Sequence, residues 1–310
     1  MRSCVTIAAL GLLALAVSCT RHATLERAGE LRDASAMTGP DAGEDARVRD
    51  PDADADADAD ADASPLRPPL RGFPEQLELT DGTARVGFIS VPLGAEEPRP
   101  VLIALHGGSE KPEKACAAWR AVMDGYAFVL CPRGFGGRES ALGWRTAKDT
   151  AERIEQALGA ARKVFGPWMT AATSYVLAGF SMGGSQVALV ARSNPRRYRR
   201  IVVGDSAHDP APALTFSRSW APGGGERAIF LCTTSGCEPS LRTAARNVAT
   251  HGASARLNVA PTQVHGLSEL AVQSMRRDWP WLVDGAEGWS PYVARDLTPP
   301  PGSTETFEPR

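Results

Sequence analysis

Residues 175–184 read Tyr-Val-Leu-Ala-Gly-Phe-Ser-Met-Gly-Gly, an apolar run that ends in glycines around one serine. The first four residues have the pattern of a buried strand, and the residues from Met182 onward are typical of a helix. Between them stands a G-x-S-x-G sequence, which forms a turn too tight for side chains on either flank of the serine. Such a turn lifts Ser181 above the sheet and points the helix N-terminus at developing negative charge. This stretch therefore predicts that Ser181 is a nucleophile.

The segments on either side of this stretch alternate short apolar runs with amphipathic ones. Residues 101–105 form a continuous apolar run of the kind found in strands that are buried on both faces. Antiparallel strands are predicted at 77–79 and 84–91, further strands at 127–131, 175–178, 201–203, 228–231 and 255–260, and helices at 113–123 and 147–165. This order predicts an α/β fold, with a mostly parallel sheet and helices on both faces.

A second glycine-rich turn, His106-Gly107-Gly108, directly follows the apolar run at 101–105. Glycines leave the backbone amides there free to approach an oxyanion. Gly107 and Gly108 are therefore candidate oxyanion-hole donors, together with the amide of Met182. His106 is expected to brace this loop and not to act as a base.

The loop at His106-Gly107-Gly108, the pentapeptide around Ser181 and a histidine late in the chain together resemble the α/β-hydrolase superfamily. The nearest likeness is to secreted esterases of the dienelactone-hydrolase and polyhydroxyalkanoate-depolymerase type. The resemblance covers about residues 76–290. It implies an eight-stranded sheet and a catalytic triad in the chain order serine, acid, histidine.

Three histidines follow Ser181. His208 precedes the penultimate predicted strand, and His251 stands at a predicted helix C-terminus, where a cation is favourable without any other role. His265 lies in the loop that follows the last predicted strand. This is where the resemblance places the general base.

Two carboxylates compete for the role of the acid. The superfamily usually carries the acid a few residues past the strand at 228–231, but here that segment reads Cys-Thr-Thr-Ser-Gly-Cys before Glu238. Glu238 comes one or two positions late, which a ring closed by Cys232 and Cys237 could correct. Asp205 follows the strand at 201–203, a position that some lipases of the superfamily use. The sequence leaves both residues open.

These residues predict hydrolysis of a carboxylic ester through an acyl-enzyme on Ser181, with His265 as the base. No organic cofactor is expected, because the glycines at 134–137 lack the later glycine and acidic partner of a dinucleotide site. The short Pro- and Gly-rich stretch at 206–227 favours an open site and a small-molecule or polymeric ester as substrate. A non-catalytic, surface-tethered binding protein and a peptidase, both on the same fold, are the alternatives.

The N-terminal region is typical of an exported protein. A basic start and an apolar run at 5–17 predict a signal peptide over residues 1–18. Residues 16–19, Ala-Val-Ser-Cys, resemble the bacterial lipobox, which implies acylation of Cys19, and Thr20 in place of Asp after this cysteine implies anchoring in the outer membrane. A plain extracellular protein is the alternative.

The Asp-Ala repeat within 19–72 predicts a disordered tether, because such a segment buries too little apolar surface to fold. The hydrolase domain is expected at 73–290, and a disordered tail at 291–310.

The overall composition is that of a globular protein. A net charge of -2, with 43% hydrophobic and 23% charged residues, argues against a nucleic-acid-binding protein. Besides Cys4 and Cys19 the chain has four cysteines, and an even number in an oxidising compartment predicts two disulfides. Of the three pairings, the sequence neighbourhoods favour Cys116 with Cys131 and Cys232 with Cys237. No metal site is expected, since no Cys-x-x-Cys pair occurs.

Overall fold

The structure is a computed structural model that describes residues 68–136, 142–206, 209–290, 292–294 and 301–310. The predicted signal peptide, Cys19 and residues 19–67 of the predicted tether lie outside these residues, as does His208. Among the described helices, none is long and apolar enough to cross a membrane.

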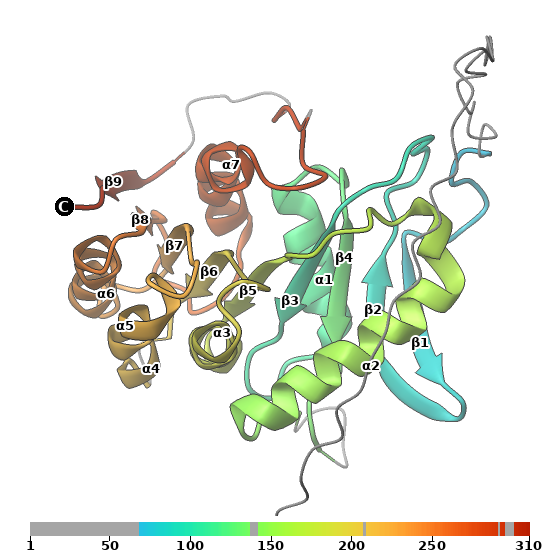
Figure 1. Ribbon diagram of the computed structural model, residues 1–310, viewed down its shortest axis with the longest axis horizontal. Coiled ribbons are helices and arrows are strands. Elements are labelled where there is room, and N and C mark those ends of the chain that lie inside the picture. Colours follow the sequence, from blue (N-terminus) through green and yellow to red (C-terminus); the bar gives the residue numbers. More distant parts are fainter. Residues whose placement is uncertain (1–67, 137–141, 207–208, 291, 295–300) are drawn as a thin grey trace, which may run out of the picture. The chain divides into compact units, whose positions relative to one another are not determined.

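One sheet runs through the described part of the chain (Figure 1). Its strands are β1 (Gln76–Asp81), β2 (Ala84–Ser90), β3 (Val101–Leu105), β4 (Phe128–Pro132), β5 (Val176–Phe180), β6 (Arg200–Gly204), β7 (Arg227–Cys232), β8 (Ser254–Val259) and β9 (Ser303–Phe307). They lie in the order β1-β2-β4-β3-β5-β6-β7-β8-β9. The strands from β4 to β8 are mutually parallel, whereas β1, β2 and β9 pair antiparallel with their neighbours. The predicted mostly parallel sheet is confirmed.

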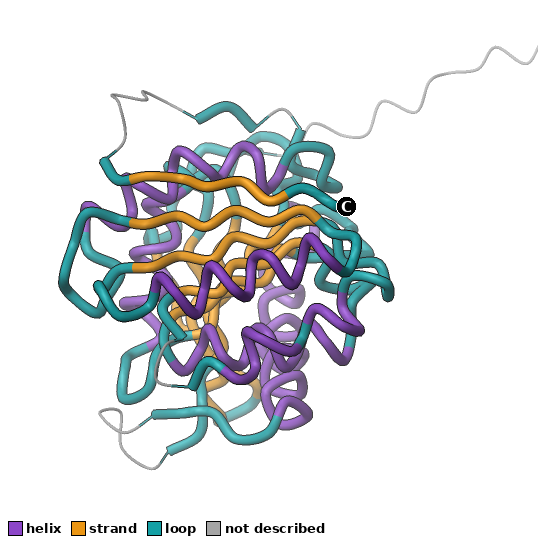
Figure 2. Tube along the Cα trace, turned by 90° about the vertical axis from the view of Figure 1, so that its left-hand side faces the viewer, coloured by secondary structure: helices purple, strands orange, loops and turns teal. Residues whose placement is uncertain are grey.

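The helices cover both faces of this sheet, as Figure 2 shows from the β9 edge. They are α1 (Pro112–Val122), α2 (Ala147–Phe165), the 3-10 turn η2 (Gly166–Trp168), α3 (Met182–Ser193), α4 (Ala211–Thr215), α5 (Ser217–Trp220), α6 (Glu238–Thr250) and α7 (Glu269–Val283). Ile103 and Leu105 of β3 share a core with α2, α3 and α6, whereas Leu102 and Ala104 share one with α1 and α7. The continuous apolar run of β3 is therefore buried on both faces, as predicted.

The sheet has one strand more than the eight that the resemblance implies. The additional strand is β9, which pairs antiparallel with β8. The prediction of a disordered tail over 291–310 is therefore wrong for Ser303–Phe307. The buried Asp278 of α7 explains why this polar segment is ordered. Its carboxylate accepts hydrogen bonds from Thr304 at 2.7 Å and from Asn258 of β8 at 2.6 Å.

Both favoured disulfides are present. Cys116 of α1 is bonded to Cys131 of β4, with 5.8 Å between their Cα atoms. Cys232, the last residue of β7, is bonded to Cys237 at the start of α6, with 5.6 Å between the Cα atoms. The prediction of these pairs is confirmed, and the other two pairings are excluded.

The turn between β5 and α3 depends on close packing of the backbone. A Cβ atom at Gly183 would lie 2.3 Å from the carbonyl oxygen of Leu105, and one at Gly184 would lie 2.6 Å from that of Gly204. A Cβ atom at Gly179 would lie 2.5 Å from the carbonyl oxygen of Gly183. Only glycine therefore lets α3 begin against the ends of β3 and β6.

We expect Gly183→Ala to lower the free energy of unfolding by about 3 kcal/mol or more, because the added methyl group meets backbone and not a flexible side chain. Gly159→Ala is the matched control. Gly159 is an exposed glycine inside α2, and a Cβ atom there would have no neighbour within 4 Å. This substitution should raise stability by up to about 1 kcal/mol. Urea unfolding followed by circular dichroism measures both, and equal effects would contradict the packing argument.

Candidate active site

Ser181 stands between β5 and α3 with a backbone conformation that residues other than glycine rarely adopt. Its φ angle is 57° and its ψ angle is −123°. The backbone N–H of Ser181 donates to the carbonyl oxygen of Gly204 at 2.8 Å, which fixes the turn against β6. Strained residues of this kind persist where the surrounding structure holds them, and they cluster at functional sites.

His265 is the side chain that the structure brings to this serine. Its Nε2 atom lies 2.9 Å from Ser181 Oγ, within hydrogen-bond distance. The imidazole ring also packs against the ring of Phe180, with 5.0 Å between the ring centroids. The loop between β8 and α7 thus places His265 where the resemblance implied a general base.

The carboxylate next to His265 belongs to Asp205. Its Oδ2 atom lies 3.3 Å from Nδ1 of His265. Asp205 follows β6, has a φ angle of 35° and is 1% exposed. Two hydroxyls from the segment after β7 donate to the same Oδ2 atom, Thr233 at 2.5 Å and Thr234 at 3.1 Å. The carboxylate is therefore both buried and oriented.

Glu238 does not reach His265. It is the first residue of α6, and its carboxylate accepts a hydrogen bond from Arg242, one turn along the same helix, at 2.7 Å. Of the two candidate acids, the structure brings Asp205 to the site. The reason is topological: β6 lies directly beside β5, so its carboxyl end is next to the Ser181 turn, whereas Glu238 lies a whole loop beyond the end of β7.

The predicted oxyanion-hole donors are only partly available. The amide of Gly107 donates to Oε2 of Glu110 at 2.7 Å, so this N–H is already used. The amide of Gly108 has no acceptor among the described residues. A Cβ atom at Gly108 would lie 3.2 Å from the side chain of Met182, so the two residues are adjacent. Met182 is the first residue of α3, where backbone amides have no partner within the helix.

His106 braces the glycine loop, as the sequence predicted. Its ring is fully buried, with Nδ1 2.7 Å from the carbonyl oxygen of Gly107 and Nε2 accepting a hydrogen bond from the amide of Gly134 at 3.1 Å. Trp144 stacks on the ring and donates from Nε1 to the carbonyl oxygen of His106 at 2.8 Å. Burial lowers the pKa of His106, so the ring is a neutral structural element with its proton on Nδ1.

A cavity of about 380 Å³ opens beside Ser181 and His265. Its lining comes from the loops that follow β3, β5 and β8 and from the start of α1, including Glu110, Lys111 and Lys114. None of its lining residues belongs to α4 or α5, the two short helices within the Pro- and Gly-rich stretch. In the described part of the chain, no group of three His, Cys, Asp or Glu side chains could hold a metal ion.

Sequence reasoning missed three polar side chains of this site: Thr233, Thr234 and Glu110. A signal for the threonines existed, because they follow β7 and the carboxyl ends of neighbouring parallel strands meet at one edge of the sheet. No comparable signal pointed to Glu110, since only the fold of its loop turns its carboxylate back onto Gly107.

Comparisons with known proteins find similarity in structure. Neither the protein-family models nor the curated protein sequences match the chain. Est1E from Butyrivibrio proteoclasticus, solved with ferulic acid bound, has a TM-score of 0.50 and 14% sequence identity, over 67% of this chain and 99% of Est1E. A carboxylesterase from Mesorhizobium loti gives 0.49 and 17%, over 68% and 100% of the two chains. FphF, a fluorophosphonate-binding serine hydrolase of Staphylococcus aureus, gives 0.49 and 13%, over 67% and 98%. At 14% identity the likeness to Est1E shows a shared fold.

The buried His106 should make the stability of the fold sensitive to acid. In the unfolded chain this histidine has a pKa of about 6.5, and in the folded chain its pKa is lower. Below pH 6.5 the unfolded state therefore binds a proton that the folded state does not, and stability falls by at most about 1.4 kcal/mol per pH unit. We expect the loss between pH 7.5 and pH 5.5 to be smaller in His106→Gln. Urea unfolding of both proteins at both pH values measures this difference. The other histidines are common to the two proteins, so their contributions to the pH dependence cancel. Equal losses in the two proteins would contradict it.

Proposed function

The chain has the α/β-hydrolase fold, and on this basis we propose that it is a serine hydrolase that cleaves carboxylic esters through an acyl-enzyme. The observation that carries the proposal is the line of three side chains at one edge of the sheet. Ser181 Oγ lies 2.9 Å from Nε2 of His265, and Nδ1 of the same ring lies 3.3 Å from Asp205. A nucleophile, a base and a group that orients the base are the parts that acyl transfer needs.

Asp205 sets the tautomer of the base. Its buried Oδ2 atom accepts the hydrogen bonds of two threonine hydroxyls and faces Nδ1 of His265. A proton on Nδ1 is therefore favoured, which leaves the lone pair of Nε2 directed at Ser181. His265 removes the hydroxyl proton as Ser181 Oγ bonds to the ester carbonyl carbon.

The negative charge that develops on the carbonyl oxygen needs donors that are in place before the reaction. The amides of Gly108 and Met182 are the two that the structure offers, and the N-terminus of α3 adds the positive end of its dipole. Glu110 contributes indirectly, because its hydrogen bond to Gly107 holds the loop that carries Gly108.

The remaining steps return every group to its starting state. The tetrahedral intermediate collapses, the bond from the carbonyl carbon to the alcohol oxygen breaks, and His265 gives its proton to the departing alcohol. Water then attacks the acyl-enzyme, with His265 again taking the proton. The bond from the carbonyl carbon to Ser181 Oγ then breaks, His265 returns its proton to Oγ, and a carboxylic acid is released.

This proposal is preferred to a non-catalytic binding protein. That alternative was motivated by the missing acid after β7, and Asp205 at the end of β6 supplies a buried carboxylate in its place. No feature of the described cavity favours an amide over an ester, so peptidase activity is not proposed.

The same proposal includes export and a lipid anchor at Cys19 in the outer membrane. The basic and apolar start of the chain and the lipobox-like residues before Cys19 support it. The two disulfides support it independently, because such bonds persist in oxidising compartments.

Replacing the nucleophile tests the enzymatic proposal most directly. We expect Ser181→Ala to reduce kcat/KM for p-nitrophenyl acetate and butyrate by about 10⁴-fold or more, with an unchanged circular dichroism spectrum. A fluorophosphonate should add one label to the wild-type protein, located at Ser181 by peptide mass spectrometry, and none to the variant. Activity of the variant within tenfold of the wild type would contradict the role given to Ser181, and no labelling of the wild type would favour the binding-protein alternative.

Replacing each carboxylate separately tests the assignment of the acid. Asp205→Asn should lower kcat by about 10² to 10⁴-fold, because the amide favours the wrong tautomer of His265. Glu238→Gln is the matched control and should leave kcat within about threefold, since this carboxylate contacts Arg242 and not the site. The reverse pattern would assign Glu238. If both variants keep wild-type rates, neither residue orients the base.

A further inference from the structure

Helices α1 and α7 line a groove on the surface of the protein. Both helices cover the same face of the sheet (Figure 1). The rings of Trp119 on α1 and Trp279 on α7 contact each other, with 6.3 Å between their centroids. The groove that the two helices line has a volume of about 560 Å³, within the range of pockets for small ligands. We call it the α1–α7 groove.

The α1–α7 groove adjoins the cavity beside Ser181. α1 follows the glycine loop after β3 and α7 follows the loop after β8, so both helices start at the carboxyl ends of the strands. Lys114, in the first turn of α1, lines the catalytic cavity and the groove alike. On the side of α7, Gly266 lines the catalytic cavity and the next residue, Leu267, lines the groove. A chain that leaves Ser181 between Lys114 and Gly266 therefore enters the groove.

The walls of the groove are mainly apolar. The apolar lining residues are Ala117, Ala118 and Ala121 on α1, Leu267 before α7 and Val272 on α7. Ala117 is exposed, and Ala118 and Ala121 are half-buried, so these methyl groups form a wall that a ligand can reach. The exposed Lys114 adds the apolar surface of its four-carbon stem while its ammonium group stays in water.

The polar side chains that α7 contributes to the groove already have partners. Gln273 donates from Nε2 to Oε1 of Glu269 at 3.2 Å. Arg276 donates to the carbonyl oxygen of Ala121 from two nitrogens, at 2.7 and 2.9 Å, and is bound to Asp124 at 2.7 Å. A polar ligand would compete with these contacts, whereas an apolar chain leaves them intact. The lining therefore favours an apolar occupant.

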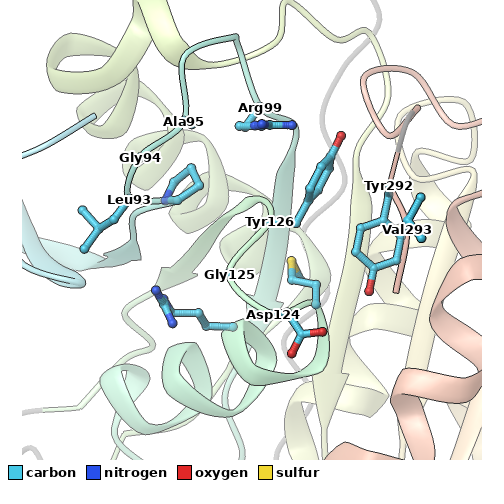
Figure 3. Close-up of a pocket in the computed structure, with 12 residues that line it drawn as sticks. Leu93, Gly94, Ala95, Arg99, Asp124, Gly125, Tyr126, Tyr292 and Val293 are labelled. Atoms are coloured by element: carbon cyan, nitrogen blue, oxygen red, sulfur yellow. The ribbon is translucent and has the colours of Figure 1, made fainter. Parts of the chain in front are cut away.

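The far end of the groove is closed by Arg276, whose guanidinium group bridges from α7 to α1. Between Lys114 and Ala121 α1 advances by seven residues, or about 10 Å. Beyond this bridge lies a further cavity of about 510 Å³, which Asp124 lines together with Tyr126, at the amino ends of the strands (Figure 3). The groove is thus a separate space that adjoins the catalytic cavity at its near end.

We propose that the α1–α7 groove binds a linear apolar chain of the ester that Ser181 cleaves. The inference rests on the proposed ester hydrolysis and names its substrate class, esters with one medium-length alkyl or acyl chain. The chain crosses the cavity beside Ser181, passes between Lys114 and Gly266, and lies against the alanines of α1. Each methylene group that moves from water to an apolar wall improves binding by up to about fourfold. An open groove covers one side of the chain, so the gain per methylene is smaller but accumulates along the chain.

Three esters test the proposal on the full chain. Ethyl octanoate and octyl acetate are isomers that carry the long chain on the acyl and on the alcohol side, and ethyl acetate lacks it. We expect kcat/KM, measured by titration of the released acid, to be at least about tenfold higher for one or both isomers than for ethyl acetate. The preferred isomer shows which side of the ester enters the groove. A smaller preference for both isomers would overturn the proposal.

Substitutions on α1 then locate the chain. In Ala118→Leu the larger side chain fills the near part of the groove, so the preference for the long ester over ethyl acetate should fall to about threefold or less. Ala117→Asp places a charge against the chain and should lower the same preference, because an apolar chain does not compensate for the lost hydration of a carboxylate. A fall in either variant supports the proposal, and a wild-type preference in both would overturn it.

Ala151→Leu is the matched control for these substitutions. Ala151 is a half-buried alanine on α2 and lines a hollow that shares no described residue with the catalytic cavity or the groove. Its preference for the long ester should equal that of the wild type, and an equal fall in this control would overturn the proposal. The ratio of two kcat/KM values cancels the concentration of active sites, so incomplete folding of a variant does not imitate a lost preference.

Binding without turnover separates this proposal from the enzymatic one. The three esters are titrated calorimetrically into Ser181→Ala, and we expect at least one long isomer to bind at least about tenfold more tightly than ethyl acetate. If the wild type hydrolyses no ester but this preference in binding is found, the proposed hydrolysis fails and the groove stands as a binding site. If all three esters bind alike, the groove fails, and hydrolysis of ethyl acetate by the wild type would leave the enzymatic proposal standing.

Discussion

The approach of α3 to the carboxyl ends of β3 and β6 is the constraint on which the rest of the site depends. Gly183 and Gly184 bring the first turn of the helix into backbone contact with Leu105 and Gly204, where no side chain fits. The chain can make so tight a turn only with Ser181 in a strained, positive-φ conformation. That conformation sets the serine hydroxyl at the carboxyl ends of the strands, where Ser181 Oγ lies 2.9 Å from Nε2 of His265.

The order of the strands brings Asp205 and His265 to the Ser181 turn. From β5 to β8 the strands are neighbours in the same order as in the chain, so the loops after them meet at one edge. Asp205 follows β6, Thr233 and Thr234 follow β7, and His265 follows β8. The disulfide between Cys232 and Cys237 closes the loop that carries both threonines, which limits the freedom of the two hydroxyls that hold Asp205.

The two edges of the sheet carry different chemistry. At the carboxyl ends of the strands Glu110, Lys111 and Lys114 line the cavity beside Ser181, and the buried Asp205 faces Nδ1 of His265. At the amino ends Arg99 and Arg120 line another cavity, together with the half-buried Tyr126 and Tyr292. Tyr292, which follows α7 in the chain, lines this cavity, and β9 adds the last strand to the sheet.

The sequence by itself predicted the α/β fold, and it singled out Ser181 and His265, whose Oγ and Nε2 atoms the structure places 2.9 Å apart. The apolar periodicity and the glycines around Ser181 are local signals, as is the position of His265 after the last predicted strand. The sequence did not decide between Asp205 and Glu238 as the acid. Asp205 follows β6 and Glu238 follows β7, and which of these strands lies beside β5 is a property of the assembled sheet. The sequence also did not predict that the amide of Gly107 donates to Glu110, because this contact forms only when the loop folds back. Nor did it predict β9, whose polar residues pair with β8 and whose Thr304 donates to Asp278. Local patterns identify residue types, but contacts between segments far apart in the chain exist only after those segments have packed.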